Sequence, residues 1–426
     1  MTNDIRQLTK MRILQIVPSV SLVYGGPSQM VLGLSKALAN QGVDVTILTT
    51  DSNGDFGQAP LDVPLDKPVS QDGYQVRYFR CSPFRRYKFS LDLLRWLWQH
   101  AGEFDLAHIH ALFSPVSTAA ATVARKRNLP YILRPLGTLD PADLQKKRRL
   151  KQVYVGLWEG ANLAGAAGIH FTSEQEAKIS QRFGTNAPDI VIPLGVTPPE
   201  DVGMLNATSL RQGGFCTNDI INSEIKVPKP APTDVLENVS TQSPILLFMS
   251  RIDPKKGLDL LIPALETLLA EELGFQFILA GANPQDPEYE RQIQQQIQAS
   301  SLSSQTTITG FVEGEVKATL LHKADLFVLP SYYENFGIAV AEAMVAGVPV
   351  VISDQVHICQ EVKGAEAGWV CGCDVASLTQ TLREALRDAG EQKRRGVNAR
   401  DYALEHYSWD AIAQTMIEAY QNIIDN

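Results

Sequence analysis

The sequence predicts an α/β protein in which two doubly wound domains each contain a parallel β-sheet. Short apolar runs of strand type alternate with helices along most of the 426 residues, which is typical of repeated βαβ units. The alternation stops between residues 198 and 243, where Asn, Ser, Thr and Gly mix with a Pro-rich stretch. We therefore expect one domain over 1–197, a linker or insertion over 198–243, and a second domain over 244–405.

In the first domain, apolar runs predict strands that alternate with helices. The strands are expected at 12–18, 43–49, 74–80, 106–110, 131–134, 168–172 and 189–193. The helices are expected at 28–40, 90–100, 117–128 and 173–183. The Asp-, Pro- and Gly-rich segment 51–73 is expected to be a loop. Gly25 and Gly26 precede the first helix, where paired glycines either let the backbone approach a ligand or form a plain tight turn.

The second domain repeats this alternation. Its strands are expected at 245–250, 275–281, 308–312, 325–329 and 348–352. Its helices are expected at 258–269, 314–323, 337–346, 377–389 and 391–405, and a last helix begins at 408.

Composition argues against several classes of protein. The chain is 44% hydrophobic and 20% charged, as globular proteins are, and has no apolar run of about 18 residues that would span a membrane. The N-terminal stretch lacks the shape of a signal peptide, and five cysteines fit a reducing compartment better than a disulfide framework. Cys371 and Cys373 form one close pair without a second pair at zinc spacing, so we expect a cytoplasmic protein without a metal site.

The net charge of −9 is unevenly distributed along the chain. Residues 1–197 contain more Lys and Arg than Asp and Glu, whereas the remainder carries the acidic excess. Nucleic acid is therefore not an expected partner of the whole chain, but an anionic surface suits its first half.

A basic amphipathic helix is predicted over 143–158. Its basic side chains are those of Lys146, Lys147, Arg148, Arg149 and Lys151. Apolar residues lie among them, which suits peripheral contact with an anionic membrane. The alternative is a solvated helix with one buried stripe, and the sequence leaves both interpretations open.

Residues 324–351 combine a strand, a polar loop, a helix of small residues and a second strand. A helix N-terminus leaves N–H groups unpaired and carries partial positive charge, so a phosphate suits the point where loop meets helix. The carboxyl ends of strands, where this loop lies, are also where open α/β sheets bind ligands. For Glu334 there are two interpretations: it faces the part of the ligand that lies beyond the phosphates, or it is a solvated side chain at a helix start. Glu342 binds a pair of ligand hydroxyls or forms a salt bridge with a neighbour.

Two strands of the first domain end in polar side chains. His108 and His110 share one face of the strand 106–110, because side chains alternate with a period of two. Arg134 ends the next strand, at the edge where a phosphate or another ligand would bind. His110 either belongs to the core or faces a ligand.

Several motifs recur in an informative order. Residues 334–337 read Glu-Asn-Phe-Gly, 342–344 read Glu-Ala-Met, and 347–351 read Gly-Val-Pro-Val-Val. They resemble the signature of the glycosyltransferases of family four, also called group 1. The resemblance covers most of the chain apart from roughly 200–243. It implies the two-domain GT-B fold with a central cleft, transfer with retention of configuration, and a terminal helix within 406–426 that crosses back to the first domain.

The resemblance also implies a set of site residues. The donor-binding set is Gly25, Gly26, Arg251, Lys256, Phe311, Val312, Glu334, Asn335, Phe336, Gly337 and Glu342. Arg251 and Lys256 would bind the donor diphosphate, since two cations on a strand-to-helix turn neutralise such a leaving group without a metal. Glu334 would hold the donor sugar. On the acceptor side, His110 would lie near the transferred sugar, and Arg134 is added to this side by its place at a strand's carboxyl end. The catalytic candidates are Glu334, His110, Arg251 and Lys256.

The resemblance thus implies a retaining, metal-independent glycosyltransferase that needs no cofactor. It would move a hexose from a nucleoside-diphosphate sugar to a glycan or lipid-linked acceptor, in exopolysaccharide or cell-surface glycan synthesis. The lack of an Asp-x-Asp motif fits metal independence. Two other classes remain: a sugar-nucleotide epimerase on the same fold, and a non-catalytic sugar-nucleotide binder that scaffolds a partner. The intact charged residues of the donor set argue against the binder.

Overall fold

The computed structural model describes residues 10–54, 58–140, 144, 148–199, 243–284 and 286–426. The chain divides into two compact units: the first runs to Gly195 and also includes Trp409–Asn426, and the second is Val196–Ser408. Residues 200–242 of the expected linker lie outside the described residues. Of the helices that are described, none is both long and apolar enough to cross a bilayer.

The described part of the first unit contains an eight-stranded sheet in the order β3-β4-β2-β1-β5-β6-β7-β8. Its strands are β1 (Arg12–Ile16), β2 (Asp44–Thr50), β3 (Pro68–Gln71), β4 (Tyr74–Phe79), β5 (Leu106–His110), β6 (Tyr131–Arg134), β7 (Gly168–Phe171) and β8 (Asp189–Val191). Neighbouring strands are parallel except at the edge, where β3 pairs antiparallel with β4. This is the doubly wound arrangement that the alternating pattern predicts.

The edge strand β3 is the main departure from the predicted elements of this unit, because segment 51–73 was expected to be a loop. Asp72 and Gly73 join β3 to β4 with φ values of 44° and 85°. Two positive φ values are typical of the tight turn that Asp-Gly forms in hairpins. Pro68 has no N–H to donate, and an edge strand tolerates that loss.

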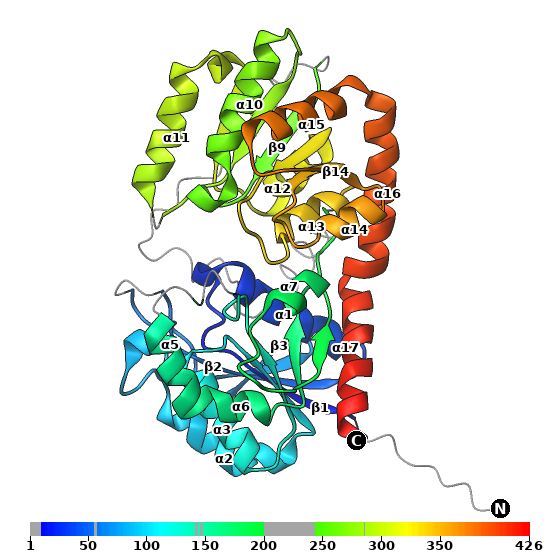
Figure 1. Ribbon diagram of the computed structural model, residues 1–426. Coiled ribbons are helices and arrows are strands. Elements are labelled where there is room, and N and C mark those ends of the chain that lie inside the picture. Colours follow the sequence, from blue (N-terminus) through cyan, green and yellow to red (C-terminus); the bar gives the residue numbers. More distant parts are fainter. Residues whose placement is uncertain (1–9, 55–57, 141–143, 145–147, 200–242, 285) are drawn as a thin grey trace, which may run out of the picture. The chain divides into compact units, whose positions relative to one another are not determined.

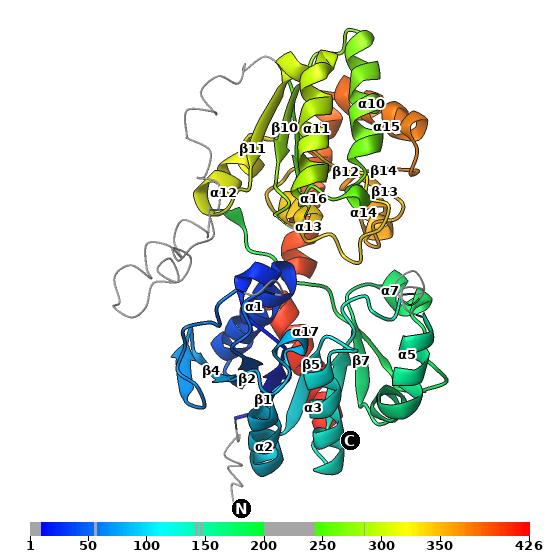
Figure 2. The same cartoon turned by 90° about the vertical axis from the view of Figure 1, so that its left-hand side faces the viewer.

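Helices cover both faces of this sheet, as the two core clusters show. The helices are α1 (Gly26–Asn40), α2 (Leu91–His100), α3 (Pro115–Lys126), α5 (Arg148–Tyr154), α6 (Gly160–Ala164), α7 (Glu174–Ile179) and α17 (Trp409–Ile424). Leu14 of β1 packs in one cluster with residues of α2 and α3. Ile13 packs in the other with residues of α1 and α17. Alternate residues of one strand therefore enter opposite cores, and Figure 2 shows α17 beside α1.

The described part of the second unit contains a six-stranded sheet in the order β11-β10-β9-β12-β13-β14. All its pairs are parallel. Its strands are β9 (Ile245–Met249), β10 (Gln276–Ala280), β11 (Thr306–Gly310), β12 (Leu326–Leu329), β13 (Val350–Ser353) and β14 (Gly368–Cys371). The central strands are buried throughout, as strands covered on both faces must be.

The helices of the second unit lie on both sides of this sheet (Figure 1). They are α10 (Leu258–Ala270), α11 (Pro287–Ala299), α12 (Gly314–Lys323), α13 (Ile338–Val345), α14 (Cys359–Gly364), α15 (Val375–Arg387) and α16 (Ala389–Tyr407). α10 packs against α15, and α13 packs against α16. The short α13 begins after Gly337 and ends before Gly347, which agrees with the glycine stops in the sequence.

Candidate functional site

The donor-side candidates of the second unit lie on two loops where the strand order reverses. β9 and β12 are neighbours in the sheet, but the chain continues from β9 toward β10 and from β12 toward β13, on opposite sides. Open α/β sheets bind ligands at the carboxyl ends of strands at such a point. The loop after β9 carries Arg251 and Lys256, and the loop after β12 carries Glu334.

Backbone contacts fasten these two loops together. Gly257 has a φ of +74°, and a Cβ at this position would lie 2.1 Å from the carbonyl oxygen of Pro330. Only glycine fits such an approach. Tyr332 donates its N–H to the carbonyl of Lys255 at 2.8 Å. Within the first loop, the Asp253 carboxylate accepts the N–H of Lys255 at 3.1 Å and fixes the turn.

Lys256 and Glu334 form an ion pair between the two loops. Their side chains are 10% and 20% exposed, so both charges are largely withdrawn from water. The backbone of Glu334 is also fixed: its N–H donates to Gln355 at 3.1 Å, and its carbonyl accepts from His357 at 3.0 Å. The structure therefore brings together the predicted phosphate-binding lysine and the predicted sugar-binding glutamate.

The N-terminus of α13 lies three residues beyond this glutamate. Gly337 precedes the helix in the left-handed conformation, with a φ of 82°, and no side chain caps the helix. Asn335 accepts a hydrogen bond from the Tyr333 hydroxyl. An uncapped helix start presents N–H groups and partial positive charge, which is a suitable environment for a phosphate.

Glu342 lies on α13 and pairs with a lysine that the sequence analysis does not single out. Lys317 of α12 approaches Glu342 Oε1 at 2.5 Å, and the two side chains are 30% and 20% exposed. This is the salt bridge that the sequence left open as the alternative to hydroxyl binding. Within the described residues, only Oε1 is engaged, so one carboxylate oxygen is available for a second partner.

The remaining donor-side candidates differ in exposure. Arg251 is exposed and lies 3.7 Å from the Asp253 carboxylate. Phe311 is 47% exposed, whereas Val312 is buried. Phe336 is buried with its ring edge-on to Tyr407 at 5.2 Å, so its side chain packs in the core of this unit.

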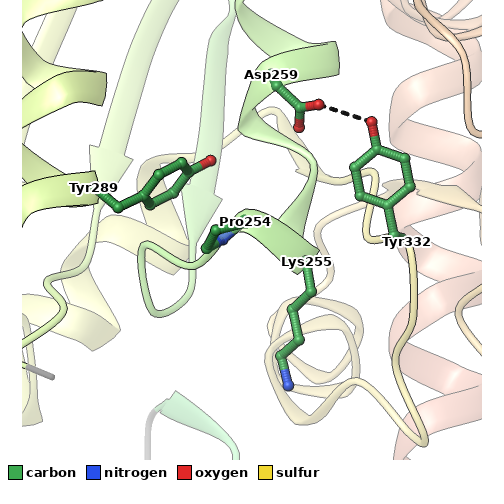
Figure 3. Close-up of a pocket in the computed structure, with 5 residues that line it drawn as sticks. All are labelled: Pro254, Lys255, Asp259, Tyr289 and Tyr332. Carbon is green, nitrogen blue, oxygen red and sulfur yellow. Dashed lines mark hydrogen bonds between the residues drawn. The ribbon is translucent and has the colours of Figure 1, made fainter. Parts of the chain in front are cut away.

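An open pocket of about 460 Å³ lies beside the same loops (Figure 3). Its lining residues are Pro254, Lys255, Asp259, Tyr289 and Tyr332. The Tyr332 hydroxyl donates to the Asp259 carboxylate at 2.8 Å, and burial together with this bond raises the pKa of Tyr332 to about 12. Consecutive lysines thus have different surroundings: Lys256 pairs with Glu334, and Lys255 lines the pocket. Burial, helped by the charge of Lys256, lowers the pKa of Lys255.

In the first unit, Gly25 precedes the fifteen-residue helix α1, which begins at Gly26. Gly25 has φ 69° and ψ −134°, a conformation that side chains disfavour, and no side chain caps the helix. The backbone thus requires glycine at the first position. The start of α1 has the same chemical character as the start of α13.

His110 and Arg134 are covered in this structure, contrary to the expectation that they face a ligand. His110 is completely buried, and its Nε2 bonds to Gln15 Oε1 at 2.7 Å. Arg134 is 3% exposed, and burial lowers its pKa to about 10. The reason is that α17 covers this face of the sheet. The sequences of β5 and β6 do not predict this cover, because α17 comes much later in the chain.

Part of the expected basic helix over 143–158 lies outside the described residues, and the described part is less regular than predicted. Lys146 and Lys147 lie outside the described residues, α5 covers Arg148–Tyr154, and a π-helical turn follows over Val155–Glu159. Three large apolar side chains of this region are more than half exposed, namely Val153, Leu157 and Trp158. Separately, the described residues contain no group of three or more His, Cys, Asp or Glu side chains that could hold a metal ion.

Two doubly wound units, with a terminal helix returning to the first, define the GT-B class of glycosyltransferases. The Anabaena protein HepE, solved with UDP and glucose, has this fold: it superposes with a TM-score of 0.68 and 20% identity over 97% of this chain and 100% of that one. Residues 25–195 match the model of the glycosyl transferase 4-like domain, and residues 236–402 match that of glycosyl transferases group 1. The chain belongs to the group 1 glycosyltransferases.

Relatives differ in how much of each chain they share. A D-inositol 3-phosphate glycosyltransferase of Xylanimonas cellulosilytica is 26% identical over 93% of this chain and 91% of its own length. An uncharacterized glycosyltransferase of Methanocaldococcus jannaschii is 31% identical over 43% of this chain. That match spans 46% of the archaeal protein, so several curated relatives are matched over less than half their length.

Proposed function

We propose that this chain transfers a hexose from a nucleoside-diphosphate sugar to a hydroxyl of a glycan or lipid-linked acceptor, with retention of configuration and without a metal ion. The observation that carries the proposal is the ion pair between Lys256 and Glu334 beside the uncapped start of α13. It places a cation, a carboxylate and free N–H groups at the edge of the sheet where α/β proteins bind nucleotides.

In this proposal the diphosphate lies on Arg251, Lys256 and the N-terminus of α13. These groups stabilise the charge that develops on the leaving diphosphate, which is how sites without a metal favour such a departure. Lys256 exchanges Glu334 for the phosphate when the donor binds. Glu334 is then available to accept hydrogen bonds from the hydroxyls of the donor sugar.

The nucleoside occupies the side of the site near α12. Glu342 accepts hydrogen bonds from the ribose hydroxyls through the oxygen that Lys317 leaves available, and the backbone at Phe311 and Val312 meets the base. HepE was solved with UDP, which makes uridine the first base to test. Exopolysaccharide or cell-surface glycan synthesis is the setting that we propose.

Retention is assigned without a covalent intermediate. Double displacement would require a carboxylate nucleophile. In this proposal Glu334 binds the donor sugar and does not form a covalent bond with it. The acceptor hydroxyl attacks from the face of the leaving group. The departing phosphate takes the proton of that hydroxyl.

Peripheral contact with an anionic membrane is the second part of the proposal. Val153, Leu157 and Trp158 are 56%, 63% and 53% exposed, and Arg149 of the same region is exposed as well. Apolar side chains beside basic ones favour the interface of anionic lipid.

In flotation with phosphatidylserine vesicles, Leu157→Ser and Trp158→Ser together should lower the bound fraction. Val397→Ser, which alters an apolar residue exposed to 60% in the other unit, is the control. Equal flotation of all three proteins contradicts membrane contact.

A panel of UDP-, GDP- and ADP-sugars tests the enzymatic proposal, with thermal shift and slow hydrolysis as readouts. One responding nucleotide names the donor, and release of free sugar supports transfer. Release of an epimer of the donor sugar, or no response from any member, contradicts the proposed activity.

A further inference from the structure

A chain of hydrogen bonds runs through the core of the first unit beneath α17. Its side chains are fully or almost fully buried, with exposed fractions of 0–2%, and they are Gln15, His108, His110, His170 and Tyr420. Burial lowers the pKa of all three histidines, that of His170 to about 3, so each ring is neutral. A neutral ring has one donor and one acceptor nitrogen, so each bond constrains the next.

The first proton positions follow from a backbone carbonyl. His170 Nε2 lies 2.8 Å from the carbonyl oxygen of Ile192, which only accepts, so Nε2 carries the proton. His170 Nδ1 is therefore an acceptor. It lies 3.2 Å from His108 Nε2, which must then be the donor of that bond. His108 Nδ1 is left as an acceptor.

The remaining positions follow in the same way. Tyr420 lies 2.8 Å from His108 Nδ1 and donates its hydroxyl proton there. Its oxygen accepts from Gln15 Nε2 at 3.1 Å. Gln15 Oε1, an acceptor, lies 2.7 Å from His110 Nε2, which therefore carries the proton. All three histidines thus have the proton on Nε2, and His110 Nδ1 is left as a bare acceptor.

The chain of hydrogen bonds ends at His110, next to Arg134, whose Nε–H is a donor without a partner among the described residues. Among the described residues, neither His110 Nδ1 nor Arg134 Nε has a hydrogen-bond partner, although both atoms are buried. His110 and Arg134 are direct neighbours in the register of β5 and β6. A buried polar atom without a partner is destabilising, so a group that bonds to both of these atoms would be favoured here.

The backbone beyond both residues is held in an uncommon conformation. Ala111 and Phe113 follow His110 with a φ of 64° each, and Leu136 follows Arg134 with a φ of 55°. Left-handed conformations at residues other than glycine are strained and cluster at ligand sites. His110 and Arg134 are covered in this structure, so the proposal that follows includes a shift of these segments when a ligand binds.

We propose that this chain of hydrogen bonds fixes His110 as the Nε2–H tautomer, so that Nδ1 accepts a hydrogen bond from a sugar hydroxyl while Arg134 Nε–H donates to the same oxygen. A hydroxyl both donates and accepts, whereas an ionised phosphate has no proton for Nδ1. Tyr420, His108 and His170 are positioning residues, and Tyr420 gives the terminal helix a part in the site. The identity of the hydroxyl as a sugar's rests on the proposed function, but the tautomer does not.

Nitrogen-15 NMR of the labelled full-length chain tests the tautomer directly. The chain has seven histidines, so single His→Gln variants assign the ring signals. We expect His108, His110 and His170 to show a protonated Nε2 and a bare Nδ1 from about pH 6 to 8, where an exposed histidine titrates. A proton on Nδ1 of His110, or a charged ring, overturns the proposal.

Two substitutions test whether the chain of hydrogen bonds positions His110. Tyr420→Phe removes the donor to His108 and the acceptor of Gln15, so His110 should show mixed tautomers and sugar transfer should fall at least tenfold. Tyr131→Phe is the matched control, because its hydroxyl is equally buried in this unit but bonds to the Asn162 carbonyl. Gln15→Leu breaks the last link if Tyr420→Phe does not fold. Unchanged His110 signals in both variants overturn the proposal.

A measurement on the second unit separates this inference from the proposed function. UDP binding by calorimetry should be the same for the wild-type chain and Tyr420→Phe, since the diphosphate residues lie on other elements. If wild-type protein binds no nucleotide while its histidines have the expected tautomers, the proposed function fails and the positioning chain stands. Altered UDP binding in Tyr420→Phe would overturn the assignment of Tyr420 as a residue that acts only by positioning His110.

Discussion

Lys256 and Glu334 lie 78 residues apart in the chain and form an ion pair at the carboxyl edge of the second sheet. Gly257 makes the pair possible, since its lack of a side chain lets the two loops touch. In the proposed site both partners have a second role, one toward the phosphate and one toward the sugar.

Replacing Lys256 tests its role toward the phosphate. Lys256→Ala removes the buried cation and leaves Glu334 unpaired, so the affinity for UDP should fall about 10- to 100-fold, the range of a charge-assisted contact. Lys255→Ala is the control, since it removes an adjacent lysine that lines the pocket of Figure 3. Calorimetry with UDP compares them. Equal losses would mean that only the total positive charge matters.

Glu342 and Lys317 can be separated by substitution. If Glu342 binds the ribose, Glu342→Ala should weaken UDP binding about tenfold, whereas Lys317→Ala should leave the carboxylate able to bind and cost much less. If Glu342 merely completes a salt bridge, the two variants will behave alike. Titration of both proteins with UDP distinguishes these outcomes. Arg251→Ala, in contrast, should lose mainly rate.

Gly257 should be intolerant of any side chain. Gly257→Ala forces a Cβ against the Pro330 carbonyl at a positive φ, and we expect a loss of about 2–4 kcal/mol in the free energy of unfolding. Gly310→Ala has a similar φ, 71°, but open space around the new Cβ, and should cost only about 1 kcal/mol. Urea unfolding measures both. Similar losses would show that backbone conformation alone accounts for the effect.

The three buried histidines should make the first unit sensitive to acid. An unfolded histidine takes up a proton near pH 6.5, whereas the buried rings remain neutral to much lower pH, His170 to about 3. The contribution of these neutral rings to the free energy of unfolding is therefore fully present above pH 6.5. It should fall as the pH drops from 6.5 toward 3, by about 1.4 kcal/mol per histidine and pH unit.

Urea unfolding at several pH values measures this slope. His170→Gln should make the decline shallower by about one histidine's share. His406→Gln alters an exposed ring and should leave the slope unchanged. A stability that is flat between about pH 7 and 5 would contradict neutral buried rings.

Much of the second unit follows from local sequence. The apolar run that becomes β12, the glycines on either side of α13 and the basic turn after β9 are all read within a few residues. Such signals predict both the elements and the loops that carry Lys256 and Glu334, because strand ends and helix starts are local features.

The remaining features depend on contacts between distant parts of the chain. Period two correctly groups His108 with His110, but their burial is set by Tyr420, 312 residues after His108. The partner of Glu342 depends on how α12 packs beside α13. Local patterns contain neither fact. The hairpin turn at Asp72 and Gly73 is different, since Asp-Gly is a recognised signal for the edge strand that was expected to be loop.

The stereochemistry of the released sugar tests the central claim most directly. Proton NMR follows slow hydrolysis of the nucleotide sugar that responds in the panel, before the free sugar reaches its anomeric equilibrium. We predict that the wild-type chain releases the anomer present in the donor, and that Lys256→Ala does so at least about 100-fold more slowly. Release of the opposite anomer, or equal rates for both proteins, would contradict a retaining transferase that uses Lys256.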